Sequence, residues 1–453
     1  MEFTSDQSRK GNLGATTARS AAAAYGVPRD VPRLVTGNAG DHQPIHTLLR
    51  AANQAPSYED FVTWLDEPAY EPTNRLLMKR GSQIIAHVHV LARSAWFQGV
   101  ELPVGGLLDL AVLPEHREAG CESSLLRAAD WAMRDHGAVL AFCRTDQPEV
   151  CRACGWSEVR GQRFTEANVS DILAMLSPPS AAPGRRQRPL RIRFWRHVEL
   201  DALRSAYHHV SCRSWGAFER SEAYWRWLVS RKAHDELIVA VDGEDLWDDP
   251  ASPANIVGYA VTRGSQVIEL GCEPGYGRAA RRLLARACQD AIERDLRTLS
   301  LHLPADDPLH DLMLAAGGAW STSARAQGGT LLVKLLDPLH WTEALFPVLL
   351  RRAQHARIAR PFHVTFDTDR QCYRFELTRR SGRLVRDDVR HDESVDVRAT
   401  PGAMADLLVG NLDVAAACPS GKLEICDAAT AERLAALFPP ATFWQSQFDT
   451  LRF

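Results

Sequence analysis

Residues 105–126, GGLLDLAVLPEHREAGCESSLL, decide the fold, because their hydrophobic pattern changes period halfway along. The first half has the length and apolar content of a buried strand, which Asp109 interrupts and Pro114 ends. From Ser123 onward the apolar residues recur at helical spacing. We therefore predict a strand, a tight turn at Gly120 and a helix.

The turn between this strand and this helix is a candidate anion site. The first N–H groups of a helix have no intrahelical partner and lie at the positive end of the helix dipole. A pyrophosphate fits such a terminus. The order of strand, glycine turn and helix therefore predicts a phosphate-binding loop over residues 117–123.

Composition narrows the classes of protein. The chain has 453 residues, enough for roughly three domains. Lys plus Arg is 53 and Asp plus Glu is 56, a net charge of −3, so charge gives no reason to expect nucleic acid or a membrane as partner. No apolar run approaches the roughly 20 residues of a membrane-spanning helix, and the first residues do not read as a secretory signal. The 10 cysteines are scattered, which is typical of a reduced, cytoplasmic protein.

Shifts in composition divide the chain. A Pro-rich basic segment, SPPSAAPGRRQRPL, marks the first boundary, and the order of strands and helices before it recurs loosely after it. We expect a flexible tail over residues 1–32, a first domain over 33–176, a linker over 177–189, a second domain over 190–336 and a third over 337–453. In the second domain we expect residues 215–229 to be helical. The last segment is so aromatic that we expect it to be docked.

Two motifs resemble the GNAT superfamily of acyl-CoA N-acyltransferases. That family's pyrophosphate loop reads Arg/Gln-x-x-Gly-x-Gly/Ala, which aligns with residues 117–122, REAGCE. Its Tyr-x-x-x-Gly-Phe/Tyr motif aligns with residues 151–156, CRACGW. The whole layout is similar to the enhanced-intracellular-survival family: two tandem GNAT-like mixed-sheet domains and a sterol-carrier-protein-like domain, an α+β fold throughout. Gly105, Gly106, His116 and the final Phe453 also match that family.

The resemblance implies an enzyme that transfers an acyl group from acetyl-CoA to a primary amine, such as a lysine, a polyamine or an aminoglycoside. It implies no metal, and assembly as hexamers. Backbone groups of Leu110, Ala111 and Val112 would hold the pantetheine. The carboxylate of Phe453 would be the general base, and the residue at Cys151 the general acid. The pyrophosphate would contact Arg117, Glu118, Ala119, Gly120, Cys121, Glu122 and Ser123.

The chain departs from the family at positions that matter for chemistry. Cys151 replaces a tyrosine, and a thiol with a pKa of about 8.5 can donate a proton but is shorter than a phenol. It is therefore either a substitute acid or an inert, buried small residue. Glu118 and Glu122 carry charge that repels a pyrophosphate by roughly 1 kcal/mol or more, although Glu122 can also turn outward as a first-turn residue.

Two further residues allow alternative interpretations. Asp109 is either a general base acting through water or a solvent-facing strand residue. Cys151 and Cys154 form a C-x-x-C, but no second pair of ligands completes a zinc set nearby, so we expect no metal. The alternative to an enzyme is an inactive relative that binds a small ligand or a partner and has kept the architecture.

Overall fold

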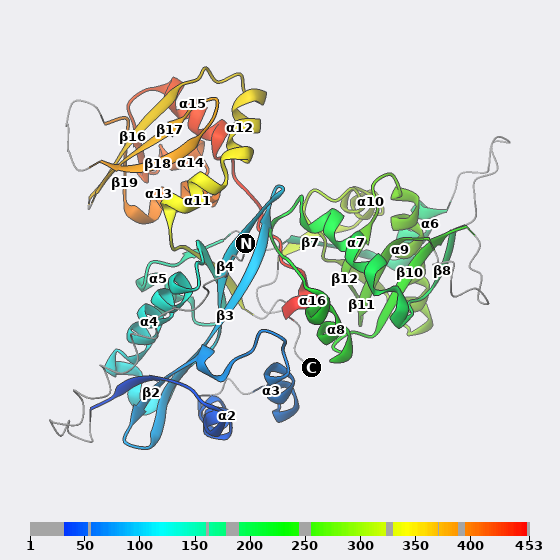
Figure 1. The fold of residues 1–453 in the computed structure, drawn as a ribbon. Helices are drawn as coiled ribbons and strands as arrows, with labels where there is room; N and C mark the ends of the chain where they lie inside the picture. Colours follow the sequence, from blue (N-terminus) through cyan, green and yellow to red (C-terminus); the bar gives the residue numbers. More distant parts are fainter. Residues whose placement is uncertain are drawn as a thin grey trace, which may run out of the picture.

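The computed structural model describes residues 31–52, 56–159, 163–177, 190–243, 255–322, 329–369, 371–387 and 395–450. The expected tail and linker fall almost wholly outside these ranges. The described chain forms three units, each built on its own sheet, and the first unit contacts both others (Figure 1). The fold is the mixed α and β arrangement that the sequence predicts, with two mixed sheets in tandem.

The first unit is organised around one long hairpin. Its strands are two apolar runs that meet at Gln98 and Gly99, both with positive φ, so the glycine suits the turn. The predicted strand, turn and helix are confirmed, although the strand begins earlier, at Val100. The elements are β1 (Arg33–Thr36), α2 (His42–Ala51), α3 (Tyr58–Leu65), β2 (Arg75–Arg80), β3 (Gln83–Phe97), β4 (Val100–Val112), the 3-10 turn η3 (Pro114–Ala119), α4 (Cys121–Asp135), β5 (Leu140–Thr145), α5 (Pro148–Ala153) and β6 (Ser157–Glu158).

The second unit repeats this order of elements. Its elements are β7 (Arg163–Asn168), α6 (Val169–Leu176), β8 (Leu190–Phe194), α7 (Leu200–Ser211), β9 (Trp215–Phe218), α8 (Glu222–Ser230), β10 (Glu236–Asp242), β11 (Ile256–Arg263), β12 (Gln266–Cys272), α9 (Gly277–Glu293), β13 (Thr298–Leu301), α10 (Leu309–Ala315), β14 (Ala319–Thr322) and β15 (Thr330–Leu335). The prediction that residues 215–229 are helical was wrong for residues 215–221, since α8 begins only at Glu222. The first four of them form β9, which pairs with β3 of the first sheet, because an adjacent strand offered backbone partners that outweighed helical spacing.

The two sheets exchange strands across the expected boundary. β7 precedes the Pro-rich segment but pairs with β13 and β14 in the second sheet. β15 follows the second unit but lies between β5 and β6 in the first sheet. The sheet orders are β1-β2-β3-β4-β5-β15-β6, with β9 beside β3, and β14-β7-β13-β12-β11-β10-β8. The boundary expected over residues 177–189 therefore does not separate two self-contained sheets.

The third unit is a five-stranded sheet with helices. Its elements are α11 (Pro338–Ala344), α12 (Phe346–His355), β16 (Phe362–Thr368), β17 (Cys372–Leu377), β18 (Gly382–Asp387), β19 (Val397–Ala399), α13 (Pro401–Val409), α14 (Val414–Ala417), β20 (Leu423–Ile425), α15 (Ala428–Leu437) and α16 (Gln447–Thr450). β18 was missed by the sequence analysis. The likeness of this unit to sterol carrier proteins stays a prediction.

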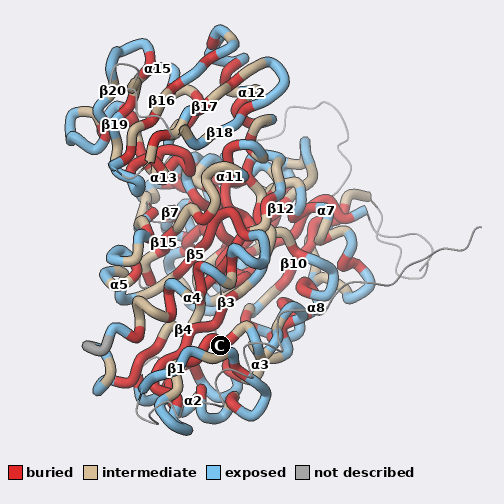
Figure 2. The backbone as a smooth tube through the Cα atoms, turned by 60° about the vertical axis from the view of Figure 1, so that its left-hand side comes forward, coloured by how far each residue is buried: buried red, intermediate tan, exposed pale blue. Residues whose placement is uncertain are grey.

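Hydrophobic burial joins the units. Figure 2 shows buried backbone running along β3, β4 and β5. Their upper part shares one core with the third unit, where Phe97 meets Trp341 with ring centroids 4.9 Å apart. The expected docking of the aromatic last segment is confirmed for its described part, because Phe443, Trp444 and Phe448 are all buried. In the ranges given above, none of the helices has the length and apolarity to cross a bilayer.

Candidate active site

A bulge in β4 reshapes the backbone at Asp109. His87 pairs with Ala111 and His89 pairs with Leu108, so two residues of β4 oppose one residue of β3. Asp109 takes a φ of 54°, which is unusual for a residue with a side chain. A bulge turns backbone groups out of the ladder. Here the carbonyl of Asp109 accepts a hydrogen bond from Nδ1 of His87 at 2.9 Å.

The neighbouring strand parts from β4 just before this bulge. β4 and β5 are parallel and pair from Val104–Leu140 to Leu107–Cys143. Both strands continue, to Val112 and Thr145, without further pairing between them. The backbone of Leu110, Ala111 and Val112 therefore has no strand partner on its β5 side, and we call this break in the pairing the β4–β5 opening. Ligands of parallel sheets bind at such an opening beyond the carboxyl ends of the strands.

Helix α4 begins at the same edge. Gly120 is its N-cap with φ 71, and the cap has no side-chain hydrogen bond. The amide of Ser124 donates a hydrogen bond to the carbonyl of Gly120 at 3.2 Å. The earlier amides of Cys121, Glu122 and Ser123 thus fall in the first turn, where helices leave their donors open. Nothing lies within 4 Å of a Cβ placed on Gly120, so the turn is open to solvent at this residue.

Glu122 is the charged side chain at this terminus. Its side chain is half-buried, and burial raises the pKa of its carboxyl while the nearby Arg117 guanidinium lowers that pKa in part. The carboxylate also acts to raise the pKa of the Cys151 thiol, so the two groups lie within electrostatic range of each other. Glu122 therefore sits within the electrostatic reach of any diphosphate bound here.

Cys151 lies on α5 with no solvent exposure. Its thiol interacts with that of Cys143 on β5, which lowers the pKa of Cys151 and, with burial, raises the pKa of Cys143 well above its ordinary value. The burial of Cys151 favours the interpretation that it is an inert, packed small residue over the interpretation that it is a substitute acid. The described cysteines are all free thiols, and among the described residues no group of three or more His, Cys, Asp and Glu gathers to hold a metal.

The last described turn of the chain, α16, is fixed between the first two units (Figure 1). Arg220 binds Asp449 through Nε and Nη2, each at 2.9 Å, and binds Glu269 of β12 through Nη1 at 2.9 Å and Nη2 at 2.6 Å. All three side chains are at most 1 % exposed. Phe453, the expected general base, lies outside the described residues, four positions beyond Asp449.

The first unit contributes a charged pair to this junction. Arg93 on β3 binds Glu67 at 2.6 Å and lies over the ring of Tyr224 from α8. Asp449 helps to raise the pKa of Arg93, so α16 lies within electrostatic range of the first sheet. Arg93 faces the same side of the sheet as His87 and His89, at alternate positions of β3. The chain therefore approaches its end beside the β3 and β4 face.

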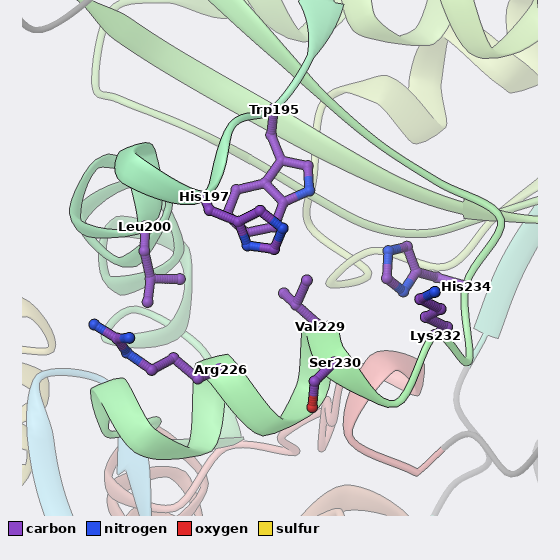
Figure 3. A pocket seen from close by; sticks show the side chains of 8 residues that line it. All are labelled: Trp195, His197, Leu200, Arg226, Val229, Ser230, Lys232 and His234. Carbon is purple, nitrogen blue, oxygen red and sulfur yellow. The ribbon is translucent and has the colours of Figure 1, made fainter. Parts of the chain in front are cut away.

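A cavity of about 450 Å³ lies elsewhere, within the second unit (Figure 3). It is lined by Trp195, His197, Leu200, Arg226, Val229, Ser230, Lys232 and His234. Arg226 is already paired with Glu222 of the same helix. None of the residues placed at the β4–β5 opening lines this cavity, so it is separate from the candidate active site.

Three residues near the site, Arg75, His87 and Arg220, were not predicted from the sequence. Arg75 and His87 lie on interior strands, where single polar residues in apolar runs are easily read as ordinary core. Arg220 lies in a short loop before α8, and its partners come from distant parts of the chain. The one available signal was the repeated histidine of HVHV at residues 87–90, which puts two imidazoles on one face of a strand.

Comparison with known proteins gives the class. Residues 34–159 match the model of the acetyltransferase (GNAT) domain. This stretch contains the bulge, the opening and the start of α4. The first unit is therefore an acetyltransferase domain of the GNAT class. A search of curated proteins found no match.

Solved structures resemble the chain over most of its length. A probable N-acyltransferase from Enterococcus faecalis is 14 % identical with a TM-score of 0.69, and covers 92 % of this chain and 99 % of its own. A GCN5-related N-acetyltransferase from Kribbella flavida is 18 % identical with a TM-score of 0.68, covering 92 % and 98 %. Eis1 from Mycobacterium abscessus is 16 % identical with a TM-score of 0.61, covering 92 % and 98 %. These similarities show a shared fold over most of the chain.

Proposed function

We propose that the protein is an acetyl-CoA-dependent N-acetyltransferase that acts on a primary amine. The observation that carries this proposal is the coincidence of three features in the first unit: the bulge at Asp109, the loss of β4–β5 pairing beyond Leu107, and the open first turn of α4. Together they offer unpaired backbone to an extended ligand with an anionic end. The match of residues 34–159 to the GNAT domain supports the same function.

The cofactor would lie along the opening. Backbone groups of Leu110, Ala111 and Val112 would bind the pantetheine amides, as an added strand does. Amides over residues 117–123, with the side chain of Arg117, would bind the pyrophosphate at the positive end of α4. The thioester would then lie next to the bulge, where a backbone N–H can stabilise the negative charge that forms on the carbonyl oxygen.

The reaction needs one base and one acid. The carboxylate of Phe453, assisted by Asp109 through water, takes a proton from the substrate ammonium. The free amine attacks the thioester carbon, the C–N bond forms, and the C–S bond breaks. The departing thiolate would take a proton from water or from Cys151, and the hydroxide or Cys151 thiolate left behind would take the second proton from the nitrogen that becomes the amide. The product amide and CoA would then leave, and the proton held by the terminal carboxylate is the one released overall. Acid–base steps of this kind contribute about 10² to 10⁴ in rate.

The substrate would be a lysine, a polyamine or an aminoglycoside-like amine, by analogy with the acyltransferases of similar fold. A hexamer is the assembly that the family resemblance implies, and sizing by light scattering tests it.

Calorimetry tests the binding of acetyl-CoA, which is the first step of the proposed reaction. We expect acetyl-CoA to bind the full chain with a 1:1 stoichiometry at micromolar concentration, followed by release of CoA when a panel of amines is added. Deleting Phe453 should abolish turnover and leave the heat of acetyl-CoA binding unchanged. Unchanged turnover would remove the terminal carboxylate from the mechanism.

The second candidate is an inactive relative that binds a ligand or a partner. The observations that favour it are the half-buried Glu122 at the start of α4 and the fully buried Cys151. An absence of binding heat at high micromolar acetyl-CoA would favour this candidate over the enzyme.

A further inference from the structure

A chain of polar contacts leads to the β4 bulge, half-buried at His42 and Tyr70 and fully buried at Arg75 and His87. We call it the bulge network: His42, Tyr70, Arg75, His87 and the carbonyl of Asp109. His42 Nε2 lies 2.7 Å from the Tyr70 hydroxyl, which accepts from Arg75 Nε at 3.0 Å. Arg75 Nη1 lies 3.0 Å from His87 Nε2, and His87 Nδ1 lies 2.9 Å from the Asp109 carbonyl.

The partners of His87 determine its protonation. The guanidinium can only donate, so Nε2 accepts; the carbonyl can only accept, so Nδ1 carries the hydrogen. Burial and the charge of Arg75 lower the pKa of His87 to about 3. The ring is thus neutral in one tautomer at any ordinary pH. It acts as a fixed connector between the guanidinium and the bulge.

The network is costly for the fold. Arg75 is 1 % exposed, and none of the ion pairs among the described residues involves it. Its Nη2 and both ring nitrogens of His89, which lies directly opposite Arg75 on β3, have no hydrogen-bond partner in the structure. Buried polar groups of this kind lower stability. The Arg75 guanidinium does lie over the rings of Phe61 and Tyr70, but these contacts leave its Nη2 and the His89 ring nitrogens without hydrogen bonds.

We propose that His87, held by Arg75, is a positioning residue that keeps the β4 bulge in the conformation that binds the thioester. The inference rests on the proposed function. The hydrogen bond to the Asp109 carbonyl fixes a backbone with positive φ at a residue that is not glycine. With that carbonyl tied to β3, the following amide, of Leu110, is left facing the opening beside β5.

His89 provides a matched control. It lies two residues from His87, on the same face of the same strand, with 1 % exposure, but makes no hydrogen bond to the bulge. We expect His87→Leu to weaken acetyl-CoA binding about tenfold, as the loss of one buried hydrogen bond to a carbonyl does. His89→Leu should change it less than about twofold. His87→Asn, whose amide can replace Nδ1–H, should restore most of the affinity.

Hydrogen exchange separates this inference from the proposed function. In the full chain without cofactor, peptides spanning residues 108–113 should exchange faster in His87→Leu than in the wild type, and at the wild-type rate in His89→Leu. Equal effects of the two leucine variants on exchange would overturn the positioning role. If the wild type fails to bind acetyl-CoA, the proposed function falls, and the exchange rates alone decide whether His87 holds the bulge.

Discussion

At the residue scale, Glu122 is the acidic side chain in the first turn of α4, where we propose that the pyrophosphate binds. Its side chain is half-buried, and burial raises the pKa of its carboxyl. At neutral pH the charged carboxylate repels a diphosphate, so we expect Glu122→Gln to tighten acetyl-CoA binding several-fold, as removal of a like charge at close range does. Calorimetry at low and high salt measures the change, which should shrink as salt screens the repulsion.

The pH dependence of the same residue has a definite sign. The wild-type affinity should rise as pH falls through the raised pKa of Glu122, because the carboxyl becomes neutral. Glu122→Gln should not show this rise in affinity at low pH. Subtracting the pH profile of the variant from that of the wild type therefore separates the effect of Glu122 from the effect of protonating the cofactor. A wild type and variant with parallel pH profiles would show that Glu122 points away from the bound diphosphate.

Cys151 carries the second prediction at this scale. Because its side chain has no exposure, we expect Cys151→Ala to keep turnover within about threefold and to leave the pH profile of kcat unchanged, since a true general acid contributes at least about 10². The lost sulfur should lower the free energy of unfolding by about 1 kcal/mol, as a small buried deletion does. A hundredfold loss of kcat would make the thiol the proton donor.

At the scale of elements, α16 is held by two buried guanidinium groups: Arg220 binds the Asp449 carboxylate, and Arg231 donates to the carbonyl of Phe448. Asp449→Asn keeps the shape of the contact with Arg220 and leaves the Glu269 pair in place, so we expect the chain to fold with its acetyl-CoA affinity unchanged. Turnover should fall by about 10²-fold, because a shift of the chain end misplaces the proposed base. Arg226→Met, which removes an exposed pair with Glu222 on α8, is the control and should keep full turnover.

A loss of acetyl-CoA affinity in Asp449→Asn would show that α16 supports the first sheet as a whole. Full turnover in that variant would show that the contact with Arg220 does not set the position of the chain end. Both outcomes differ from the expected one, in which turnover falls and the acetyl-CoA affinity stays unchanged.

At the scale of the whole molecule, buried histidines make the fold sensitive to acid. Burial lowers the pKa of His87 to about 3 and that of His302 to about 4, and the pKa values of His89 and His310 are also below the ordinary 6.5. Below pH 6.5 the unfolded chain binds protons that the folded chain does not. Stability should therefore fall as pH falls, by up to about 1.4 kcal/mol per pH unit for each such histidine.

Urea unfolding at pH 7 and pH 5 checks this expectation. His89→Leu should reduce the loss between the two values, because it removes one of the histidines without removing a hydrogen bond. Equal stability at both pH values would show that these rings are protonated in the folded protein.

The exchange of β7 and β15 predicts cooperative unfolding. A fragment of residues 31–177 lacks β15, which pairs with both β5 and β6, and carries β7 without its partners. We expect this fragment to show no cooperative thermal transition by circular dichroism. The fragment of residues 31–336 contains both complete sheets and should unfold in one transition. A folded shorter fragment would contradict the interdependence of the two sheets.

Local features were the ones that sequence could predict. The strand, turn and helix of residues 105–126 were found because a change of hydrophobic period is written in neighbouring residues. β15 could not be assigned to the first sheet, because its partner β5 lies almost 190 residues earlier and nothing local specifies that pairing. The bulge network was missed for the same reason: Asp109 and the repeated histidines stand out individually in the sequence, but only the register of three strands brings them together with Arg75.

The position of β15 has a consequence for how the protein is made. The ribosome delivers the chain from the N-terminus, so residues 34–159 emerge long before residue 330. Until then β5 has a bare edge, and the sheet that carries the proposed cofactor site is unfinished. Maturation of that site must wait for synthesis of the entire second unit, and ribosome-bound chains shorter than about residue 335 should be those that most need a chaperone.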